Sequence, residues 1–530
     1  MNKQSTTDVL ICGAGAAGLT LAIDLARRGV AFRLIDKLAG PFAGSRGKGI
    51  QPRTQEVFED LGLIDRLAAV GSVYPPQREY HDGAQHQDSD ESDILFAPPT
   101  AQEPYRTPLM VPQFQTEAVL RLRLFELGHA PEYGCELQTF EQDAGGVTAH
   151  LISPNEAESV RCRYLVGGDG GRSLVRHVLQ INFPGETLGV RAIVADLRLD
   201  GLSRDVRHRF NGGDMARQMV FSPLPHTDLF QLQAPVALEG EADLSVSGLQ
   251  RLIDARQPGS GMLVRGVTWA SAYLMNARLA EQYRVGRVLL MGDAAHIHPP
   301  TGGQGLNTSV QDAYNLGWKL GAVLAGAPET LLDSYEEERR PIAAQMLGIV
   351  TGLLEKAKHG DMRRGRELHQ LGLGYPGSSL SLEMPERRGG VLAGDRAPDA
   401  LLLGAGGQPR RLFDVLKGTH WTLIVRGQIE ASLPATNPGL RIVQVGEGGE
   451  FIDTNDVFGS VYGLAEGELL LIRPDGYVGA VLPVAESRRL TAYLANVLPE
   501  SPTLSANQNG RAASAWPAPS EVQVAVPGGD

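Results

Sequence analysis

The sequence predicts an α/β protein: a Rossmann-like dinucleotide-binding domain, an inserted β-sheet domain that interrupts it, and a further C-terminal domain. Three observations support this prediction. The stretch from Asp8 to Asp36 reads as strand, glycine-rich turn, helix and second strand. A similar strand, turn and long helix recur at residues 287–320. Between them, residues 181–269 contain short strand-like segments separated by polar turns.

The first stretch carries the pattern of a dinucleotide-binding turn. Gly13, Gly15 and Gly18 follow an apolar strand in G-x-G-x-x-G spacing. Gly13 permits a tight turn, Gly15 lets a pyrophosphate approach the backbone, and Gly18 lets the helix pack close to the strand. The helix start offers N–H groups to phosphates, and Asp36 can accept hydrogen bonds from a ribose. The alternative is a glycine-rich turn of another α/β protein.

Length and composition limit the classes of function. A chain of 530 residues suggests two to four domains, and a net charge of −12 argues against a nucleic-acid or anionic-membrane partner. Cys12, Cys135 and Cys162 have neither CxxC nor metal-ligand spacing, so we expect no metal site and a reducing, cytoplasmic location. No uninterrupted apolar run is long enough to span a membrane.

The segments after Asp36 alternate between loops and helices. The loop 37–50 holds Arg46, which could reach a phosphate or a ring carbonyl or could be a solvated loop arginine. Helical spacing predicts one helix from Thr54 to Val70. Residues 74–112 are rich in Pro, Gln, Asp and His, with short strand-like pieces such as Ile94–Phe96. They are expected to be an insertion that begins the second domain.

The middle of the chain predicts a helix at Thr116–Gly128, then strands that end in the segment Gly167–Ser173. Asp169 in that segment could cap the following helix or orient loops around a nucleotide. The strand-rich residues 181–270 are expected to cover the first domain's ligand. Candidate pocket walls, each of which could also be simple core, are Met219, Phe221, Phe230, Trp269 and Tyr273.

The chain re-enters the first domain at a buried-type strand that leads to Gly292 and Asp293. Asp293 can accept hydrogen bonds from polyol hydroxyls, and the glycines near 303 place a helix start where it can stabilise negative charge. No catalytic residue can be assigned. The weak candidates are His296, His298 and Pro299, and a histidine in such a loop more often satisfies local backbone groups.

Three segments together resemble the FAD-dependent aromatic hydroxylases, the single-component flavoprotein monooxygenases. They are GAGAAG at Gly13–Gly18, GGDGGRS at Gly167–Ser173, and the block GDAAHIHPPTGGQGLNTSVQDAYNLGWKL from Gly292 to Leu320. The resemblance covers residues 8–345. It implies FAD as cofactor, NADPH (or NADH) as reductant and dioxygen as co-substrate. The residues that it implies for cofactor binding are Gly13, Gly15, Ala16, Ala17, Gly18, Asp36, Lys37, Arg46, Gln113, Asp169, Gly292, Asp293, Pro300, Gly303, Gly305, Leu306 and Asn307.

The domain boundaries follow from the same comparison. We expect a discontinuous FAD-binding domain at 1–73, 113–180 and 271–385, and a substrate-binding β-sheet domain at 74–112 and 181–270. Residues 392–500 resemble the thioredoxin-like C-terminal domain of the phenol hydroxylase branch. That block has no cysteine, so thiol–disulfide exchange is excluded, and we expect it to be dispensable for flavin reduction. Residues 501–530 are rich in Ser, Ala, Pro and Gly and are expected to be disordered.

The resemblance implies hydroxylation of a phenolic or polycyclic polyketide-like aromatic substrate through a flavin C4a-hydroperoxide. The cofactor motifs do not identify the substrate, so a Baeyer–Villiger monooxygenase or a flavin reductase or oxidase on the same fold stays open. A non-catalytic flavoprotein that sequesters an aromatic compound is a further alternative. We expect a small-molecule partner, with no nucleic acid and no membrane, and leave a homodimer open.

Overall fold

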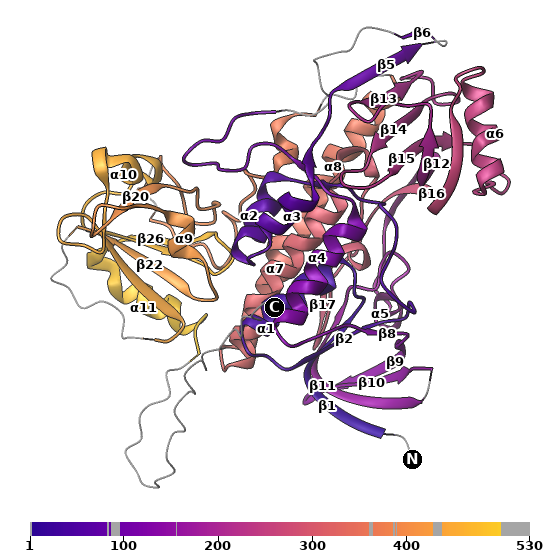
Figure 1. The fold of residues 1–530 in the computed structure, drawn as a ribbon. Helices are drawn as coiled ribbons and strands as arrows, with labels where there is room; N and C mark the ends of the chain where they lie inside the picture. The colour runs from indigo at the N-terminus through magenta and orange to yellow at the C-terminus, as the bar shows by residue number, and fades with distance from the viewer. Residues whose placement is uncertain are drawn as a thin grey trace, which may run out of the picture.

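The computed structural model describes residues 3–81, 84–85, 96–154, 156–359, 364–384, 387, 389–427 and 437–499. They form a nucleotide-binding region at the centre of Figure 1, a β-sheet region beside it, and a C-terminal region on the opposite side. The predicted α/β class is confirmed. Positions 94 and 95 of the strand expected at Ile94–Phe96, and the tail 501–530 expected to be disordered, lie outside the described residues.

The first sheet is the core of the nucleotide-binding region. Its strand order is β17-β18-β11-β1-β2-β8, with β18, β11, β1, β2 and β8 parallel, and β9 and β10 extend it as an antiparallel hairpin. Parallel strands need both faces covered, which explains the uninterrupted apolar run in β1. The bounds are β1 (Lys3–Cys12), β2 (Phe32–Asp36), β8 (Glu132–Tyr133), β9 (Glu136–Asp143), β10 (Gly146–Ile152), β11 (Ala157–Gly167), β17 (Arg284–Val285) and β18 (Val288–Leu290).

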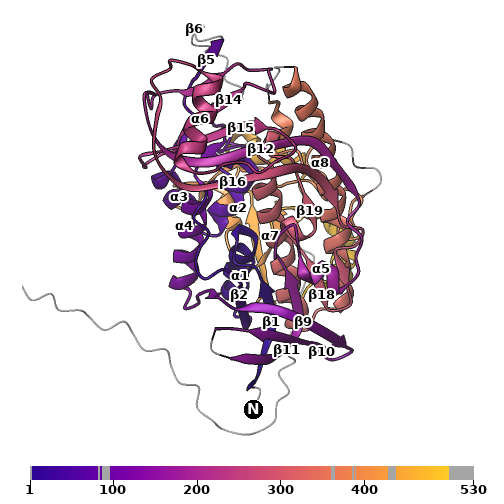
Figure 2. The same cartoon turned by 90° about the vertical axis from the view of Figure 1, so that its right-hand side faces the viewer.

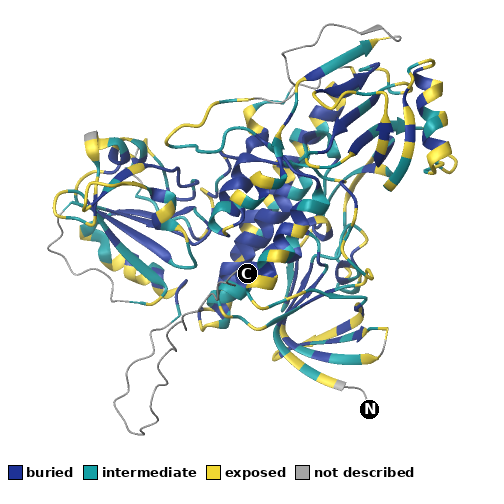
Figure 3. Ribbon diagram, viewed as in Figure 1, coloured by how far each residue is buried: buried dark blue, intermediate teal, exposed yellow. Residues whose placement is uncertain are grey.

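Helices cover this sheet, and the central ones are largely buried (Figure 3). The helix predicted from Thr54 to Val70 is two helices, because Gly62 has a φ of 75° and lies in the left-handed region that ends a helix. The bounds are α1 (Ala16–Arg27), α2 (Pro52–Asp60), α3 (Ile64–Val70), α4 (Gln113–Glu126), α5 (Leu174–Val178), α7 (Gly305–Leu324) and α8 (Asp333–Lys358).

The second sheet has the order β19-β16-β12-β15-β14-β13-β5-β6 and lies across the ends of the central helices (Figure 2). The predicted pairing of strands around 220 and 230 is confirmed by the β14–β15 ladder. Helix α6 (Val246–Arg256) covers one face. The strands are β5 (Gln77–His81), β6 (Ala84–Gln85), β12 (Gly185–Asp200), β13 (Arg207–Phe210), β14 (Met219–Pro223), β15 (Leu229–Val236), β16 (Leu263–Leu279) and β19 (His296–Ile297).

A small third sheet fixes the segment that joins the first two. Strand β7 (Leu109–Met110) pairs with β3 (Gly49–Ile50) and with β4 (Ser72–Val73). The start of the predicted insertion therefore contributes β5 to the second sheet, while its end returns to hold the segment after Arg46.

The C-terminal region is a seven-stranded sheet of order β21-β20-β24-β23-β22-β25-β26. Helices α9 (Leu412–Leu416), α10 (Val457–Tyr462) and α11 (Ser487–Ala495) pack with it. The strands are β20 (Leu401–Gly404), β21 (Pro409–Arg411), β22 (Trp421–Arg426), β23 (Leu440–Val445), β24 (Phe451–Ile452), β25 (Glu468–Ile472) and β26 (Val478–Pro483).

The turn between β25 and β26 is inserted into the nucleotide-binding region. Arg473 in this turn binds both carboxylate oxygens of Glu338 on α8, at 2.6 and 2.9 Å. Asp475 accepts a hydrogen bond of 2.9 Å from the indole of Trp318 on α7. These groups are buried, so the C-terminal region is joined to the rest through buried charges. Truncation before residue 392 would expose these charges, and dispensability of this region for flavin reduction stays a prediction for a truncated protein that folds.

Two further features concern location. None of the described helices has the length and apolar character that a bilayer-spanning segment needs. Cys12, Cys135 and Cys162 are all buried and unpaired by disulfides.

Candidate functional site

In the glycine turn after β1, Gly13 and Gly18 have no space for a side chain, whereas Gly15 borders open space. Gly13 has a φ of 104°, and a Cβ there would lie 2.2 Å from the carbonyl oxygen of Gly168. A Cβ on Gly18 would lie 1.9 Å from the carbonyl oxygen of Gly13. At Gly15 the nearest atom would be an oxygen of Glu117, 3.8 Å away, and Gly15 has no side chain to cap the α1 start at Ala16 and Ala17. The carboxyl of Glu117 interacts with the N–H of Ala16, and the open space beside Gly15 leaves room for an anion at this helix start.

Two carboxylates flank this turn. Asp36 accepts the backbone N–H of Ala14 at 2.8 Å and that of Leu38 at 2.9 Å, so it holds the turn and keeps lone pairs for a further donor. Its neighbour Lys37 is exposed. Asp169 accepts the N–H of Val175 through Oδ2, while its buried Oδ1 has no hydrogen-bond partner within the described structure. One oxygen of Asp169 therefore caps α5, and the other is left as an acceptor for a ligand.

Asp293 lies on the short turn that follows β18 and Gly292. Protein surrounds it, so burial raises the pKa of its carboxyl, against the opposing effects of His296 and Arg46. Its side chain is nevertheless accessible to solvent. A carboxylate that protein surrounds but solvent still reaches lies in a recess, and we call the space in front of Asp293 the hollow. Arg46 is exposed to the same space and also opposes the burial that raises the pKa of Tyr273 to about 12.

The start of α7 borders this hollow. A Cβ on Gly305 would meet no atom within 4 Å, and one on Gly303 would meet only Gln51 at 3.8 Å. No side chain caps the helix, which follows the turn of Pro300 and leads on to Leu306. Asn307 is fully used by the protein: it accepts the N–H of Gln51 and donates to the carbonyls of residues 49 and 303. It fixes the loop rather than presenting its own amide.

Gln113 and Glu117 on α4 connect the loop that contains Gly47 with the turn at Gly15. Gln113 accepts the N–H of Gly47 at 3.2 Å and donates to Glu117 at 2.8 Å. Glu117 lies beside Gly15, and burial raises the pKa of its carboxyl to about 7, with Gln113 opposing the shift. The sequence analysis missed Glu117. Its position four residues after Gln113 on α4 was the available signal.

The histidines near Asp293 belong to a buried network. His296 binds Asp312 at 2.6 Å, and Asp312 also accepts a 2.8 Å hydrogen bond from Arg339. Burial lowers the pKa of His298 to about 3, and the neighbouring His296 lowers it further. His298 is therefore a neutral imidazole around pH 7 and not a general acid. Pro299 is buried beside it.

The candidate pocket walls fall on opposite faces of the second sheet. Met219, Phe221 and Phe230 are at most 2% exposed and form the core with residues of α6. They are not pocket walls, since this face of the sheet is covered by its own helix. Trp269 lies on the other face, against Gly44 and 5.3 Å from the ring of Phe42. Tyr273 is only partly exposed, and the charge of Arg46 acts on its hydroxyl, so we group Tyr273 with Arg46 and Asp293.

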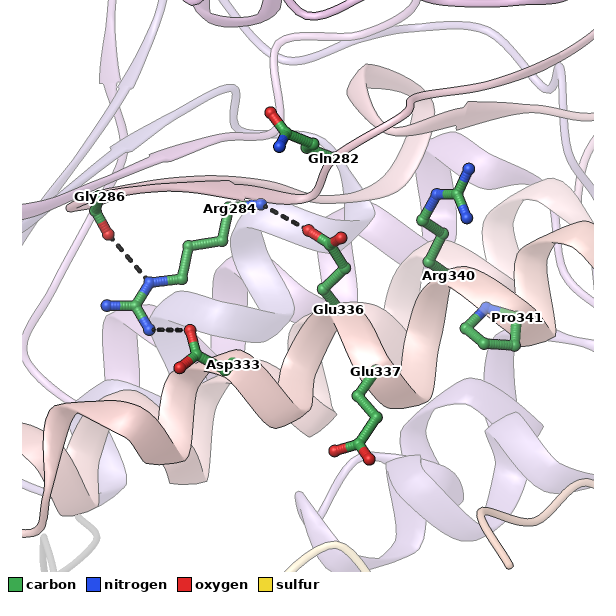
Figure 4. Close-up of a pocket in the computed structure, with 8 residues that line it drawn as sticks. All are labelled: Gln282, Arg284, Gly286, Asp333, Glu336, Glu337, Arg340 and Pro341. Atoms are coloured by element: carbon green, nitrogen blue, oxygen red, sulfur yellow. Dashed lines mark hydrogen bonds and ion pairs between the residues drawn. The ribbon is translucent and has the colours of Figure 1, made fainter. Parts of the chain in front are cut away.

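A second hollow, open and charged, lies between β17 and α8 (Figure 4). Arg284 binds Asp333 at 2.7 Å, and the backbone of Arg284 donates to Glu336. Glu337 points away from these groups and binds Ser379. These charges have partners within the protein, so this hollow offers less to a ligand than the one at Asp293.

One group of potential metal ligands occurs among the described residues: Glu132, Cys135 and Glu158. The guanidinium of Arg33 binds Glu132 at 2.6 Å and Glu158 at 2.7 Å. A cation of the protein's own therefore occupies this position.

The site combines two uncapped helix starts with three acceptors, Asp36, Asp169 and Asp293. The open space at Gly15 and Gly305 and the unpaired oxygen of Asp169 fit a ligand with a pyrophosphate, sugar hydroxyls and a ring carbonyl. These are the groups of FAD.

Comparisons with known proteins agree with this geometry. Residues 6–349 match a family model described as an FAD binding domain, and residues 391–500 match one described as the C-terminal part of aromatic-ring hydroxylases. A flavin-dependent monooxygenase of Mycobacteroides abscessus is 41% identical over 92% of this chain and 100% of its own length. A 12-dehydrotetracycline 5-monooxygenase/anhydrotetracycline 6-monooxygenase of Streptomyces rimosus is 35% identical over 89% of this chain and 94% of its own.

Among solved structures, aklavinone-11 hydroxylase in a ternary complex with FAD and aklavinone aligns with a TM-score of 0.81. The alignment covers 94% of this chain and 100% of that one, at 27% identity.

Proposed function

Because this chain belongs to the family of FAD-binding aromatic-ring hydroxylases and is a flavin-dependent monooxygenase, we propose that it hydroxylates a polycyclic phenol. One atom of dioxygen enters an activated ring, ortho or para to a hydroxyl. The polycyclic substrate is supported by relatives whose names specify tetracycline precursors and by the structural neighbour that binds aklavinone.

The FAD would extend between the two uncapped helix starts. We assign its pyrophosphate to the N–H groups at the start of α1, its adenosine ribose to Asp36, and its ribityl hydroxyls to Asp293. Gly303, Gly305 and Leu306 would face the pyrimidine end of the ring. The chemistry that FAD supplies when bound is hydride acceptance from NADPH or NADH and activation of dioxygen.

The protein contributes binding, electrostatics and exclusion of water. The positive end of α7 stabilises negative charge beside Gly305, where the glycine spacing leaves room for a ring carbonyl. The second sheet lies across the ends of the central helices (Figure 2) and would serve as the cover that is needed because water would compete with the substrate. No side chain acts as a nucleophile in this account, and the pKa of about 3 for His298 argues against a proton role there.

The observation that carries the proposal is Asp293, accessible yet surrounded by protein, beside the open start of α7. The test uses the FAD-loaded protein with NADPH, a panel of polycyclic phenols and ¹⁸O₂. We expect one heavy oxygen in a ring hydroxyl. Label in an ester or lactone would instead identify a Baeyer–Villiger reaction, and hydrogen peroxide as the sole oxygen product would identify an oxidase or reductase.

The proposal also includes two expectations about location and oligomeric state. Three buried free thiols support a cytoplasmic location, which localisation of a fluorescent fusion would test. A homodimer would be tested by light scattering coupled to gel filtration.

A further inference from the structure

A half-buried lysine, Lys48, faces the second sheet beside the proposed flavin site. Residues 45–51 run between that sheet and the start of α7. Gly47 and Gly49 contact the α7 side: a Cβ on Gly47 would lie 3.6 Å from Leu306, and the carbonyl of Gly49 accepts from Asn307. The side chain of Lys48 points the other way. Its ammonium donates to Ser222 Oγ at 2.9 Å and to Gln231 Oε1 at 2.5 Å.

The face that Lys48 meets is polar although it lies inside the molecule. Asp196, Ser222 and Gln231 come from β12, β14 and β15, and none is exposed. Their neighbours at alternating positions point to the other face and form the α6 core. The hydrogen bonds that satisfy this interior polar surface come from Ser45 and Lys48, in the loop on the side of the sheet opposite α6.

Within the described part of the chain, the charge of Lys48 is not balanced by a direct ion pair. Lys48 forms no salt bridge with any described carboxylate. Asp196, the nearby acid, is held by the backbone and hydroxyl of Ser45. Burial lowers the pKa of Lys48 well below its usual range, Arg207 and Arg364 lower it further, and Asp196 opposes them. An anion bound beside Lys48 would favour its charged form.

Arg364 brings a second cation to the same place. Its charge, with that of Arg207, also opposes the burial that raises the pKa of Tyr74, so Arg364 acts electrostatically on both Tyr74 and Lys48. The Nε of Arg364 is buried and has no hydrogen-bond acceptor within the described structure. A nearby contrast is Arg209, which binds Glu79 at 3.0 Å. Neither Lys48 nor Arg364 forms such an ion pair with a described carboxylate.

We propose that Lys48 and Arg364 bind ionised oxygens of the substrate, which is therefore an aromatic anion (a carboxylate, phenolate or enolate) with its ring toward the start of α7. This inference rests on the proposed function. It assigns the specificity of the same site, because a cationic wall attracts an anion and discriminates against its neutral analogue. An ionised hydroxyl also makes a ring more electron-rich, as the proposed oxygenation requires.

The test measures binding to the full-length, FAD-loaded protein by perturbation of flavin absorbance, without reductant. One arm compares 3-hydroxy-2-naphthoate with its methyl ester, which tests a carboxylate. The other compares 2-hydroxy-1,4-naphthoquinone, ionised at neutral pH, with its methyl ether, which tests an enolate. In at least one arm, we expect the anion to bind about tenfold or more tightly than its neutral partner.

The variants assign that preference to the cluster. Lys48→Met should reduce the ratio to within about twofold, Lys48→Arg should retain most of it, and Arg364→Gln should reduce it in part. The control is Lys358→Met, since Lys358 lies on the surface of α8 and pairs with Glu355. It should leave the ratio unchanged. If Lys48→Met does not bind FAD, the wild-type ratio and Lys48→Arg decide.

Equal binding of anion and neutral partner in both arms, or a preference that survives Lys48→Met, would overturn the inference. Its failure is distinguishable from failure of the proposed function. A protein that prefers the anion but incorporates no ¹⁸O contradicts the monooxygenase reaction alone. One that incorporates ¹⁸O into neutral and anionic rings alike contradicts only the role of Lys48 and Arg364.

Discussion

Two charged regions of this molecule differ in how completely their groups are paired. At the turn between β25 and β26, Arg473 binds Glu338 and Asp475, and Lys319 binds Glu338 at 2.7 Å, all with side chains at most 1% exposed. Asp293, Lys48 and Arg46, by contrast, have no ion-pair partner among the described residues. The first region offsets its desolvation cost within the chain, whereas Asp293 and Arg46 stay accessible to solvent and to a ligand.

The difference separates structure from binding. In the paired region, burial would raise the pKa of Glu338, but Arg473 and Lys319 outweigh it and hold that pKa well below its usual range. Burial lowers the pKa of Lys319 to about 8, although Glu338 opposes it. Such a network fixes how two regions meet. The region at Asp293 leaves its groups for a ligand, which is the pattern of a functional site.

The largest effect, on the free energy of unfolding, is expected when the ion pairs of the paired region are broken. Glu338→Ala leaves Arg473 and Lys319 buried without their shared anion, and should lower the free energy of unfolding by about 3–5 kcal/mol in urea titrations. The exposed pair Arg441–Glu450 supplies the control: Glu450→Ala should cost about 0–1 kcal/mol. Similar values for the two variants would show that the buried network does not hold the regions together.

An intermediate effect concerns the unpaired region. Asp293→Asn should leave unfolding of the flavin-free protein nearly unchanged and weaken FAD binding by about 1.5–3 kcal/mol, or roughly 10–150-fold, because a charge-assisted acceptor is lost. Titration of FAD into the flavin-free protein measures this. Asp200→Asn is the matched control, since that carboxylate is exposed and binds Arg265. An Asp293→Asn variant with wild-type affinity would remove Asp293 from the site.

The smallest effect is a pH dependence. Burial raises the pKa of Glu117 to about 7 from an ordinary value of 4.5, so the folded protein holds a proton that the unfolded chain releases. Stability contributed by this group is present below about pH 4.5 and is lost as pH rises to about 7. Glu117→Gln should therefore gain on the order of 1 kcal/mol relative to wild type between pH 5 and pH 7. The exposed Glu355→Gln should show no such trend. A parallel pH dependence of wild type and Glu117→Gln would contradict the shift.

The glycine-rich loops were predictable because their signals are local. The spacing of Gly13, Gly15 and Gly18 predicts both the turn and its open side, and the strand before Asp293 predicts where that carboxylate lies. The paired strands of the second sheet were predictable from their alternation. The break at Gly62 was not predicted, because apolar residues keep helical spacing across it.

The missed features depend on contacts between distant residues. Alternation places Phe221 and Ser222 on opposite faces, but sequence does not tell which face α6 covers. Lys48 reads as a solvated loop lysine until the sheet is folded over it. Arg473 and Glu338 are 135 residues apart, and neither segment indicates that the other exists.

Hydrogen–deuterium exchange with and without FAD tests the central contrast most directly. The account predicts that FAD slows exchange in the segments that contain Gly15, Lys48 and Gly305, because these backbones border the hollow. Exchange in the turn at Arg473, already closed by its own ion pairs, should not change. Protection confined to the turn at Arg473, with none at the start of α7, would contradict the assignment of the two regions.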